Sequence, residues 1–598
     1  MIAKTLRRPW LFVLVLLVAG LLISFGRTLH VPVFIADEGS VLHLPVLSWW
    51  RNLPLIFSRD FLMFTDGQFR PLSYALLAVV RTFVSPENVV FWHLWLLLFH
   101  FLNAILVFLV ARHFSKHTGS AVLASLVFGL HPLAAVVVNN INYFHYLLGL
   151  TFYLSALWCY LSFVRLSQKK LYIAAILLFF LGIFTSKVVF TLPLILGLYE
   201  VFYCRSRLRK LLLRVLPFIA ISVGVSPLWL FHKPHPYYFK YVDLSAKAAR
   251  NSFFSAVGAT GWYLKGLLLG RNIPVVLRET VERILRFLHW RFLIWGAIDL
   301  GILITGGWVL RRRRWLGLGL LFAFVALLPF VTTVLNRVDI YIHWSYLYIP
   351  TVGLALFVGG LADVFWASQR HKVRQATLLV FSLVVVLYGI QQVRLNHFSG
   401  SAISYWSRAL RLNPDSETAS RELGRSYLKQ GKTAEAVDFL FSPAIKHIQS
   451  SCLIMSHHYC EQGDYLAAAI HLRMSGQEEK GLQFQNFELV TGKLFHAVGA
   501  IDYAESALGK ILMADPYNIA ATEELAYVWS LKGYVTAAEK LINQIHKLAP
   551  SCPRVGQMLT ALEEQRDAAL SSNLQVVEPP SPDRLRYMRE GVRSAQLQ

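Results

Sequence analysis

The chain has 598 residues, of which 56% are hydrophobic, and its formal net charge at pH 7 is +24. A mean hydropathy of +0.49 excludes an ordinary soluble globular protein. Many Lys and Arg residues lie in short clusters between apolar runs, a pattern typical of cytoplasmic loops and not of a nucleic-acid-binding surface. The five cysteines form no CxxC pair, so the sequence indicates neither a zinc site nor a disulfide framework.

Apolar runs of about 20 residues, the length that crosses a hydrocarbon core of ~30 Å, recur almost to residue 396. Residues 1–9 are basic and no small-residue cleavage site follows the first run, so we expect a cytoplasmic N-terminus. An odd number of spans then places the C-terminal part on the extracytoplasmic side. The eleven predicted spans are 10–29, 88–111, 119–138, 146–165, 171–186, 188–203, 211–231, 291–310, 315–335, 345–366 and 376–396.

Two further apolar runs are not predicted to cross. The run at 71–84 is too short and is predicted to lie along the membrane surface. The run at 252–270 contains three glycines and Lys265, and we expect an interfacial or re-entrant segment there. Basic clusters on both sides of this region require an even number of crossings between them, which supports that assignment.

After Ser399 the composition changes and a repeat begins. Gly499, Ala504 and Pro516 recur 34 residues later as Gly533, Ala538 and Pro550, and 34 residues is the tetratricopeptide period. Earlier units begin around Gly431 and Gly463, and a half repeat containing Trp406 precedes them. The pattern predicts an α-solenoid over residues 399–570, followed by a polar, disordered tail at 571–598.

The first outer loop, residues 30–87, concentrates acidic residues. Residues 1–400 hold only 12 of the 34 acidic residues, and Asp37, Glu38, Asp60 and Asp66 all lie in this loop. A membrane enzyme that transfers a group to a hydroxyl needs a carboxylate to accept the proton. Asp37 and Glu38 are the best candidates because they follow the first span directly; the alternative is a solvated acidic pair at a helix exit.

Cationic and polar candidates lie in other predicted outer segments. Arg70 could face a phosphate or anchor at lipid head groups, and Lys187 interrupts two apolar runs, where a charge is costly. Arg337, His343 and Tyr346 precede the tenth span. The remaining candidates for the wall of a site are Asp60, His93 and His131, although for His93 and His100 a satisfied core role is the preferred interpretation. No metal site is predicted from these residues.

Several short motifs occur in a fixed order, and together they resemble one family. They are Asp37-Glu38, Arg70-Pro71-Leu72, His93 with His100, His131-Pro132, Ser186-Lys187 and Tyr346-Leu347-Tyr348-Ile349-Pro350. With the repeats that follow, the chain resembles the transmembrane and tetratricopeptide repeat O-mannosyltransferases and their bacterial relatives in the GT-C superfamily. The acidic pair is also similar to that of the protein O-mannosyltransferases.

The resemblance implies an inverting transferase that uses a polyprenyl-phosphate sugar on the extracytoplasmic side, with Asp37 as base. The implied partners are the lipid bilayer, the lipid-linked sugar donor and an acceptor polypeptide in the repeat groove. Two positions depart from the family: the usual acidic residues after HP and after SK are replaced by Leu133-Ala134-Ala135-Val136 and by Val188. No cofactor is predicted, and a divalent cation stays an open alternative.

We therefore expect an all-α protein with a GT-C-like membrane domain at 1–398, whose catalytic loop is 30–87, and a repeat domain at 399–570. Arg70, Lys187 and Arg337 are expected to hold the donor phosphate. The expected location is a bacterial inner membrane with the repeats in the periplasm; the alternative is the endoplasmic reticulum membrane. The alternative function is an inactive relative that anchors a protein-binding solenoid, and a third alternative is transfer to a glycan or lipid.

Overall fold

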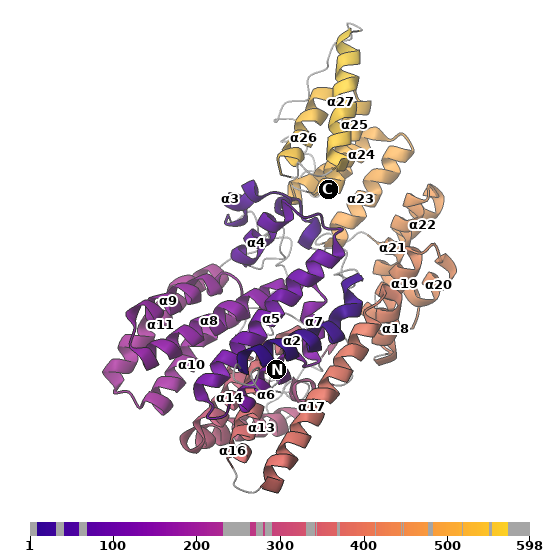
Figure 1. Cartoon of the computed structure of the whole chain (residues 1–598). Helices are drawn as coiled ribbons and strands as arrows, with labels where there is room; N and C mark the ends of the chain where they lie inside the picture. Colours follow the sequence, from indigo (N-terminus) through magenta and orange to yellow (C-terminus); the bar gives the residue numbers. More distant parts are fainter. Residues whose placement is uncertain are drawn as a thin grey trace.

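The computed structural model describes residues 9–30, 41–58, 69–230, 257, 263–270, 279–280, 290–329, 341–342, 344–367, 371–412, 414–443, 445, 448–476, 482–516, 518–548 and 553–571. The described chain is almost entirely helical, as predicted, and forms two parts: an apolar helical part and a solenoid (Figure 1). Two two-residue strands, β1 (Glu279–Thr280) and β2 (Tyr341–Ile342), pair antiparallel.

The apolar part is built from long helices joined by short helical turns. Its α-helices are α2 (Pro9–Phe25), α3 (Leu53–Ile56), α4 (Pro71–Arg81), α5 (Val89–Phe114), α6 (Thr118–Gly129), α7 (Leu133–Val138), α8 (Phe144–Leu166), α9 (Lys169–Ile183), α10 (Leu192–Tyr199), α11 (Leu208–Leu230), α13 (Trp290–Arg312), α14 (Arg314–Val325), α16 (Pro350–Trp366) and α17 (His371–Phe398). The short 3-10 and π turns are η1 (Gly26–His30), η2 (Val41–His43), η3 (Pro45–Leu47), η4 (Trp50–Asn52), η6 (Ile141–Tyr143), η7 (Lys187–Thr191), η8 (Glu200–Cys204) and η9 (Trp344–Leu347).

Seven helical segments of the described chain are long and apolar enough to cross a membrane. They are 89–114, 141–166, 187–204, 208–228, 293–312, 344–366 and 371–398. Each of the eleven predicted spans contains a helix, but the others are shorter. The predicted span 119–138 is two helices, because Pro132 lacks an N–H and separates α6 from α7. Helix α4 begins at Pro71, as expected for the surface run.

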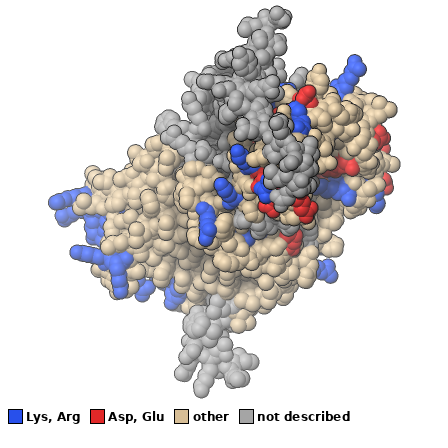
Figure 2. Space-filling view, turned by 90° about the horizontal axis from the view of Figure 1, so that it is seen from above, with Lys and Arg blue, Asp and Glu red and all other residues tan. Residues whose placement is uncertain are grey.

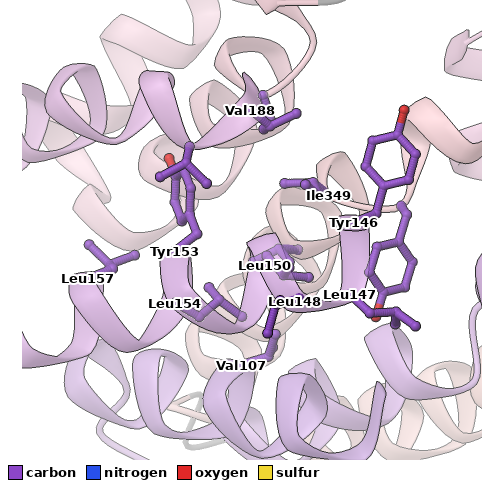
Figure 3. Packing of buried hydrophobic residues seen from close by; sticks show 14 of the residues in the cluster. Val107, Tyr146, Leu147, Leu148, Leu150, Tyr153, Leu154, Leu157, Val188 and Ile349 are labelled. Carbon is purple, nitrogen blue, oxygen red and sulfur yellow. The ribbon is translucent and has the colours of Figure 1, made fainter. Parts of the chain in front are cut away.

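Helix α8 lies at the centre of the apolar part. Its buried side chains Tyr153, Leu154 and Leu157 pack among those of neighbouring elements, including Val107 of α5 and Val188 of η7 (Figure 3). Helices α14 and α16 pack with their backbones in close contact, because each contributes a glycine, Gly319 and Gly353, at the crossing. A Cβ added at Gly353 would lie 2.3 Å from the Ala323 nitrogen, so only glycine allows this backbone contact.

The predicted helix-pair repeat is present. The solenoid helices are α18 (Ala402–Leu412), α19 (Glu417–Leu428), α20 (Thr433–Leu440), α21 (Ile448–Glu461), α22 (Tyr465–Ser475), α23 (Leu482–Ala497), α24 (Ile501–Ala514), α25 (Ile519–Leu531), α26 (Val535–Leu548) and α27 (Pro553–Ser571). They form four antiparallel pairs, with α18 before the first and α27 after the last (Figure 1).

The turn inside each pair is the same. Gly431, Gly463, Gly499 and Gly533 have φ of 73–81°, a left-handed conformation that L side chains rarely adopt. The residue after each glycine donates its N–H to a carbonyl five residues back, which closes the end of the first helix. That carbonyl belongs to an aromatic residue every time: Tyr427, Tyr459, Phe495 and Trp529. The glycine spacing therefore reports a repeated helix-capping turn.

Among the described residues, two contacts connect the two parts. Helix α18 follows α17 directly, and Cα atoms of α26 lie within 8 Å of those of η3 in the first outer loop. The last repeat thus contacts the loop that the sequence predicts to be catalytic. Figure 2 shows Asp and Glu mainly on the solenoid side of the molecule, which agrees with the change in composition after Ser399.

Candidate functional site

Several predicted site residues lie outside the described residues. These are Asp37, Glu38, Asp60, Arg337 and His343. The candidate site is therefore built here from Arg70, Lys187 and Tyr346 and from the side chains that they contact.

Arg70 is held where the first outer loop enters α4. Its Nη1 donates to Nδ1 of His145 over 2.9 Å, which joins the loop to the first turn of α8. The backbone N–H of Leu72 donates to the carbonyl of Phe184 over 3.2 Å, just before Ser186 and Lys187. The RPL and SK motifs, more than 100 residues apart in sequence, are thus neighbours in the fold.

Lys187 begins η7 and lies over an aromatic ring of the YLYIP segment. Its Nζ is 6.0 Å from the centroid of the Tyr346 ring, within range of a cation–π contact. Gly149 of α8 allows Ser186 this position, because a Cβ at Gly149 would lie 2.7 Å from the Ser186 Cβ. The SK motif is therefore held against α8 on one side and Tyr346 on the other.

Tyr146 lies next to both the Arg70–His145 pair and the Lys187–Tyr346 pair. Its ring centroid is 4.0 Å from that of His145 and 6.5 Å from that of Tyr346. Arg70 and Tyr346 both lie close to its hydroxyl group. Arg70, His145, Tyr146, Lys187 and Tyr346 form one group, which we call the outer cluster.

Tyr263, on the helical segment 263–269, is half-buried near Tyr146 and Tyr346 and so borders the outer cluster. Leu267 of the same segment is buried against Trp344 and Leu347 of η9. The segment predicted to be re-entrant therefore supplies another phenol beside the predicted site.

The outer cluster combines two cations with an imidazole and phenols. An arginine fork and a lysine ammonium are the groups that proteins use to bind phosphate, and tyrosine faces present an apolar surface with a polar edge. The loop that carries Asp37 and Glu38 returns beside this cluster, because the N–H of Val41 donates to Oδ1 of Asn142 over 3.0 Å. Asn142 lies three residues before His145.

The other predicted histidines lie in the core. His100 donates Nε2–H to the Gly129 carbonyl (3.0 Å), and its Nδ1 pairs with the Tyr348 hydroxyl (2.9 Å), which confirms the satisfied core role. His131 pairs through Nε2 with the Leu267 carbonyl (2.9 Å) and accepts at Nδ1 from the Leu133 N–H (3.2 Å). His131 thus holds segment 263–269 against α7. His93 is buried in α5.

His145 and Tyr146 are the residues that the sequence reasoning missed as candidates. The signal was present, because the run from Asn139 to Tyr146 contains three asparagines and a histidine between two apolar segments. Polar side chains in such a place are functional candidates by default. The pairing of His145 with a residue 75 positions away could not be read from the sequence.

Two other carboxylates of the apolar part are fully engaged. Glu200 is buried and accepts from Tyr160 (2.7 Å), Ser206 (2.5 Å) and Arg214 (3.0 Å). Asp363 accepts from the Ser115 hydroxyl and from the backbone N–H of His117. Both join helices next to the basic loops predicted to be cytoplasmic. Within the described residues, no group of three His, Cys, Asp or Glu side chains could hold a metal ion.

Comparison with known proteins gives no family. No family model matches the chain, and no curated protein matches it. Among the solved structures that match is the APC/C hetero-tetramer Cut9–Hcn1, at 12% sequence identity, covering 86% of this chain and 95% of that chain. Its TM-score of 0.25 carries no argument about the fold or function of this chain.

Proposed function

We propose that the chain is a membrane glycosyltransferase of the GT-C type. It transfers a sugar from a polyprenyl-phosphate donor to a Ser or Thr hydroxyl of a protein, with inversion, on the extracytoplasmic face. The observation that carries the proposal is the outer cluster, where Arg70, Lys187 and Tyr346, from three separate motifs, converge beside the returning acidic loop.

In the proposed reaction Asp37 takes the proton of the acceptor hydroxyl, and Glu38 supports it. The acceptor oxygen forms a bond to the anomeric carbon while the bond from that carbon to the phosphate oxygen breaks. The lipid phosphate leaves with the electron pair, and Arg70, Lys187 and Arg337 stabilise the charge that develops on it. Glu38 precedes Val41 by three residues, at most about 11 Å of extended chain, so the acidic pair can reach the outer cluster.

The solenoid is proposed to bind the acceptor polypeptide along its concave side. The contact between α26 and η3 brings the last repeat to the first outer loop, where the acceptor hydroxyl is needed. The proposed setting is a bacterial inner membrane with the N-terminus in the cytoplasm and the solenoid in the periplasm. Seven apolar helices of sufficient length support a membrane location.

Asp37→Asn is the direct test. Purified protein in proteoliposomes would be supplied with a radiolabelled polyprenyl-phosphate sugar and a Ser/Thr-rich acceptor peptide. We expect the transfer rate to fall by about 10²–10⁴-fold, the usual contribution of a general base. Asp438→Asn, at an exposed position of α20, is the matched control and should retain the wild-type rate. An unchanged rate in Asp37→Asn would show that Asp37 is not the base.

An inactive membrane anchor is the second candidate, and a specific observation favours it. The family usually has carboxylates shortly after HP and directly after SK, and the residues in those places, Leu133-Ala134-Ala135-Val136 and Val188, are all buried in the apolar core. No transfer by the wild-type chain, together with peptide binding that survives alanine at Asp37, Glu38 and Arg70, would favour the anchor.

A further inference from the structure

Four basic side chains lie on the last turns of α17 and on α18. Arg394 and His397 lie in the last turns of α17, and Arg408 and Arg411 lie on α18. Residues three or four positions apart share a helix face, so Arg394 and His397 lie together, as do Arg408 and Arg411. Within the described residues, Arg394, Arg408 and Arg411 form no ion pair, and the nearby Glu417 is bound to Arg421.

Arg408 is the centre of this group. Its guanidinium carbon lies 4.5 Å from the centroid of the Phe398 ring, so the planar group stacks on the last residue of α17. Its Nη1 is buried and makes no hydrogen bond. Burial, and then the nearby charge of Arg411, lowers the pKa of Arg408. Because a guanidinium keeps its proton, the side chain remains a half-buried cation with an unused donor.

An unpaired, partly desolvated cation is costly, and a second cation of the same sign beside it adds to that cost. An anion with two oxygens at guanidinium spacing would offset both effects, since it can accept from the N–H groups of Arg408 that are not buried and from Arg411 together. The group therefore has the chemistry of a phosphate site.

The position of the group indicates where the phosphate comes from. Helix α17 exposes large apolar side chains along its length, including Leu379 at 72%, Leu383 at 55% and Val386 at 54% exposure. In a membrane this surface faces lipid, so the end of α17 at Phe398 lies at head-group depth. Helix α18, which buries Tyr405, Trp406 and Ala409, follows after a short turn, with Arg408 half-buried and Arg411 exposed.

We propose that Arg408 and Arg411, with Arg394 beside them, bind the phosphate of an anionic phospholipid at the junction of α17 and α18. The bound lipid fixes the solenoid relative to the membrane surface, because Arg408 bridges the last residue of α17 and the first helix of the solenoid. This site depends on membrane insertion of the chain and not on the transfer reaction, so the two proposals fail independently.

The test counts bound lipids by native mass spectrometry. Full-length protein in an uncharged detergent would be titrated with phosphatidylglycerol or with phosphatidylcholine. We expect wild-type protein to retain one more phosphatidylglycerol than phosphatidylcholine, and Arg408→Gln/Arg411→Gln to raise the Kd for that lipid at least tenfold. Arg411→Gln alone, at an exposed position, should raise it severalfold.

The control variant is Lys429→Gln/Arg473→Gln, which removes the same charge from exposed solenoid positions away from α17 and should leave the Kd unchanged. Inorganic phosphate, added to protein that carries bound phosphatidylglycerol, separates the two sources of the anion. Unchanged phosphatidylglycerol retention in Arg411→Gln and in the double variant would overturn the proposal. Displacement of that lipid by millimolar inorganic phosphate would also overturn it, because the site would then belong to a soluble anion.

Discussion

Gly266→Ala tests whether segment 263–269 forms part of the active site. A Cβ at this position would lie 2.2 Å from Cζ3 of Trp344 and 3.0 Å from Cδ1 of Leu347. Carbon atoms pack at about 3.5–4.0 Å, so the segment and Trp344 must separate by roughly 1.3 Å or more. Tyr263 lies on this segment and Tyr346 follows Trp344, so the separation would displace the edge of the outer cluster.

A misplacement of about 1 Å can reduce an enzymatic rate about 10²-fold, and overpacking of this kind destabilises by about 1–3 kcal/mol. We therefore expect Gly266→Ala to lower sugar transfer in proteoliposomes about a hundredfold, with a small decrease in melting temperature. Gly301→Ala is the matched control, because a Cβ there would meet no atom within 4 Å. Wild-type transfer by Gly266→Ala would refute the placement of this segment in the site.

Three further predictions test other parts of the molecule. Arg70→Ala should lower sugar transfer about 10²–10³-fold and Arg70→Lys about tenfold, since Lys keeps the charge but not the forked guanidinium. If the two variants transferred sugar at the same rate, a role of Arg70 in binding phosphate would be excluded. Glu200→Ala leaves Arg214 without its carboxylate partner and should destabilise the protein by about 3 kcal/mol, as measured by thermal unfolding in detergent. A loss of stability under about 1 kcal/mol would contradict a stabilising buried ion pair between these residues. Gly533 has a φ of 81°, so Gly533→Ala should strain the turn and speed amide hydrogen exchange in α25 and α26. Gly556→Ala is the control, because a Cβ there would meet no atom within 4 Å. Equal exchange rates in the two variants would count against strain at the turn.

Features that depend on a residue's own backbone were predictable from the sequence. Pro71 begins α4, Pro132 separates α6 from α7, and the glycine spacing of the repeats gives the four turns. In each case a single proline or glycine determines the local backbone, because proline fixes φ and lacks an N–H donor, whereas glycine allows a positive φ. Residues a few positions away then complete the helix end or turn. Within the predicted span 119–138, the apolar run gives the extent of the segment, and Pro132 gives the position where the helix is interrupted.

Contacts between distant segments were not predictable. Arg70 pairs with a residue 75 positions away, and Lys187 lies over the ring of Tyr346, 159 positions further on. The sequence placed Arg70, Lys187 and Tyr346 on one face through topology alone, but it did not show which would meet. It also ranked His131 above His145, since nothing local distinguishes a histidine bonded to backbone from one bonded to arginine.

Glu200 and Asp363 already accept hydrogen bonds from several donors, which makes them poor candidates for the catalytic base. Glu200 receives three side-chain donors and Asp363 receives donors from the 115–117 turn, so removing a proton from substrate would require breaking those bonds first. Both also lie by the basic loops predicted to face the cytoplasm, away from Arg70 and Lys187. A base that acts beside the outer cluster must therefore be a carboxylate other than Glu200 and Asp363. The acidic pair that precedes Val41 meets that requirement, because Val41 is bonded to the turn that leads into His145.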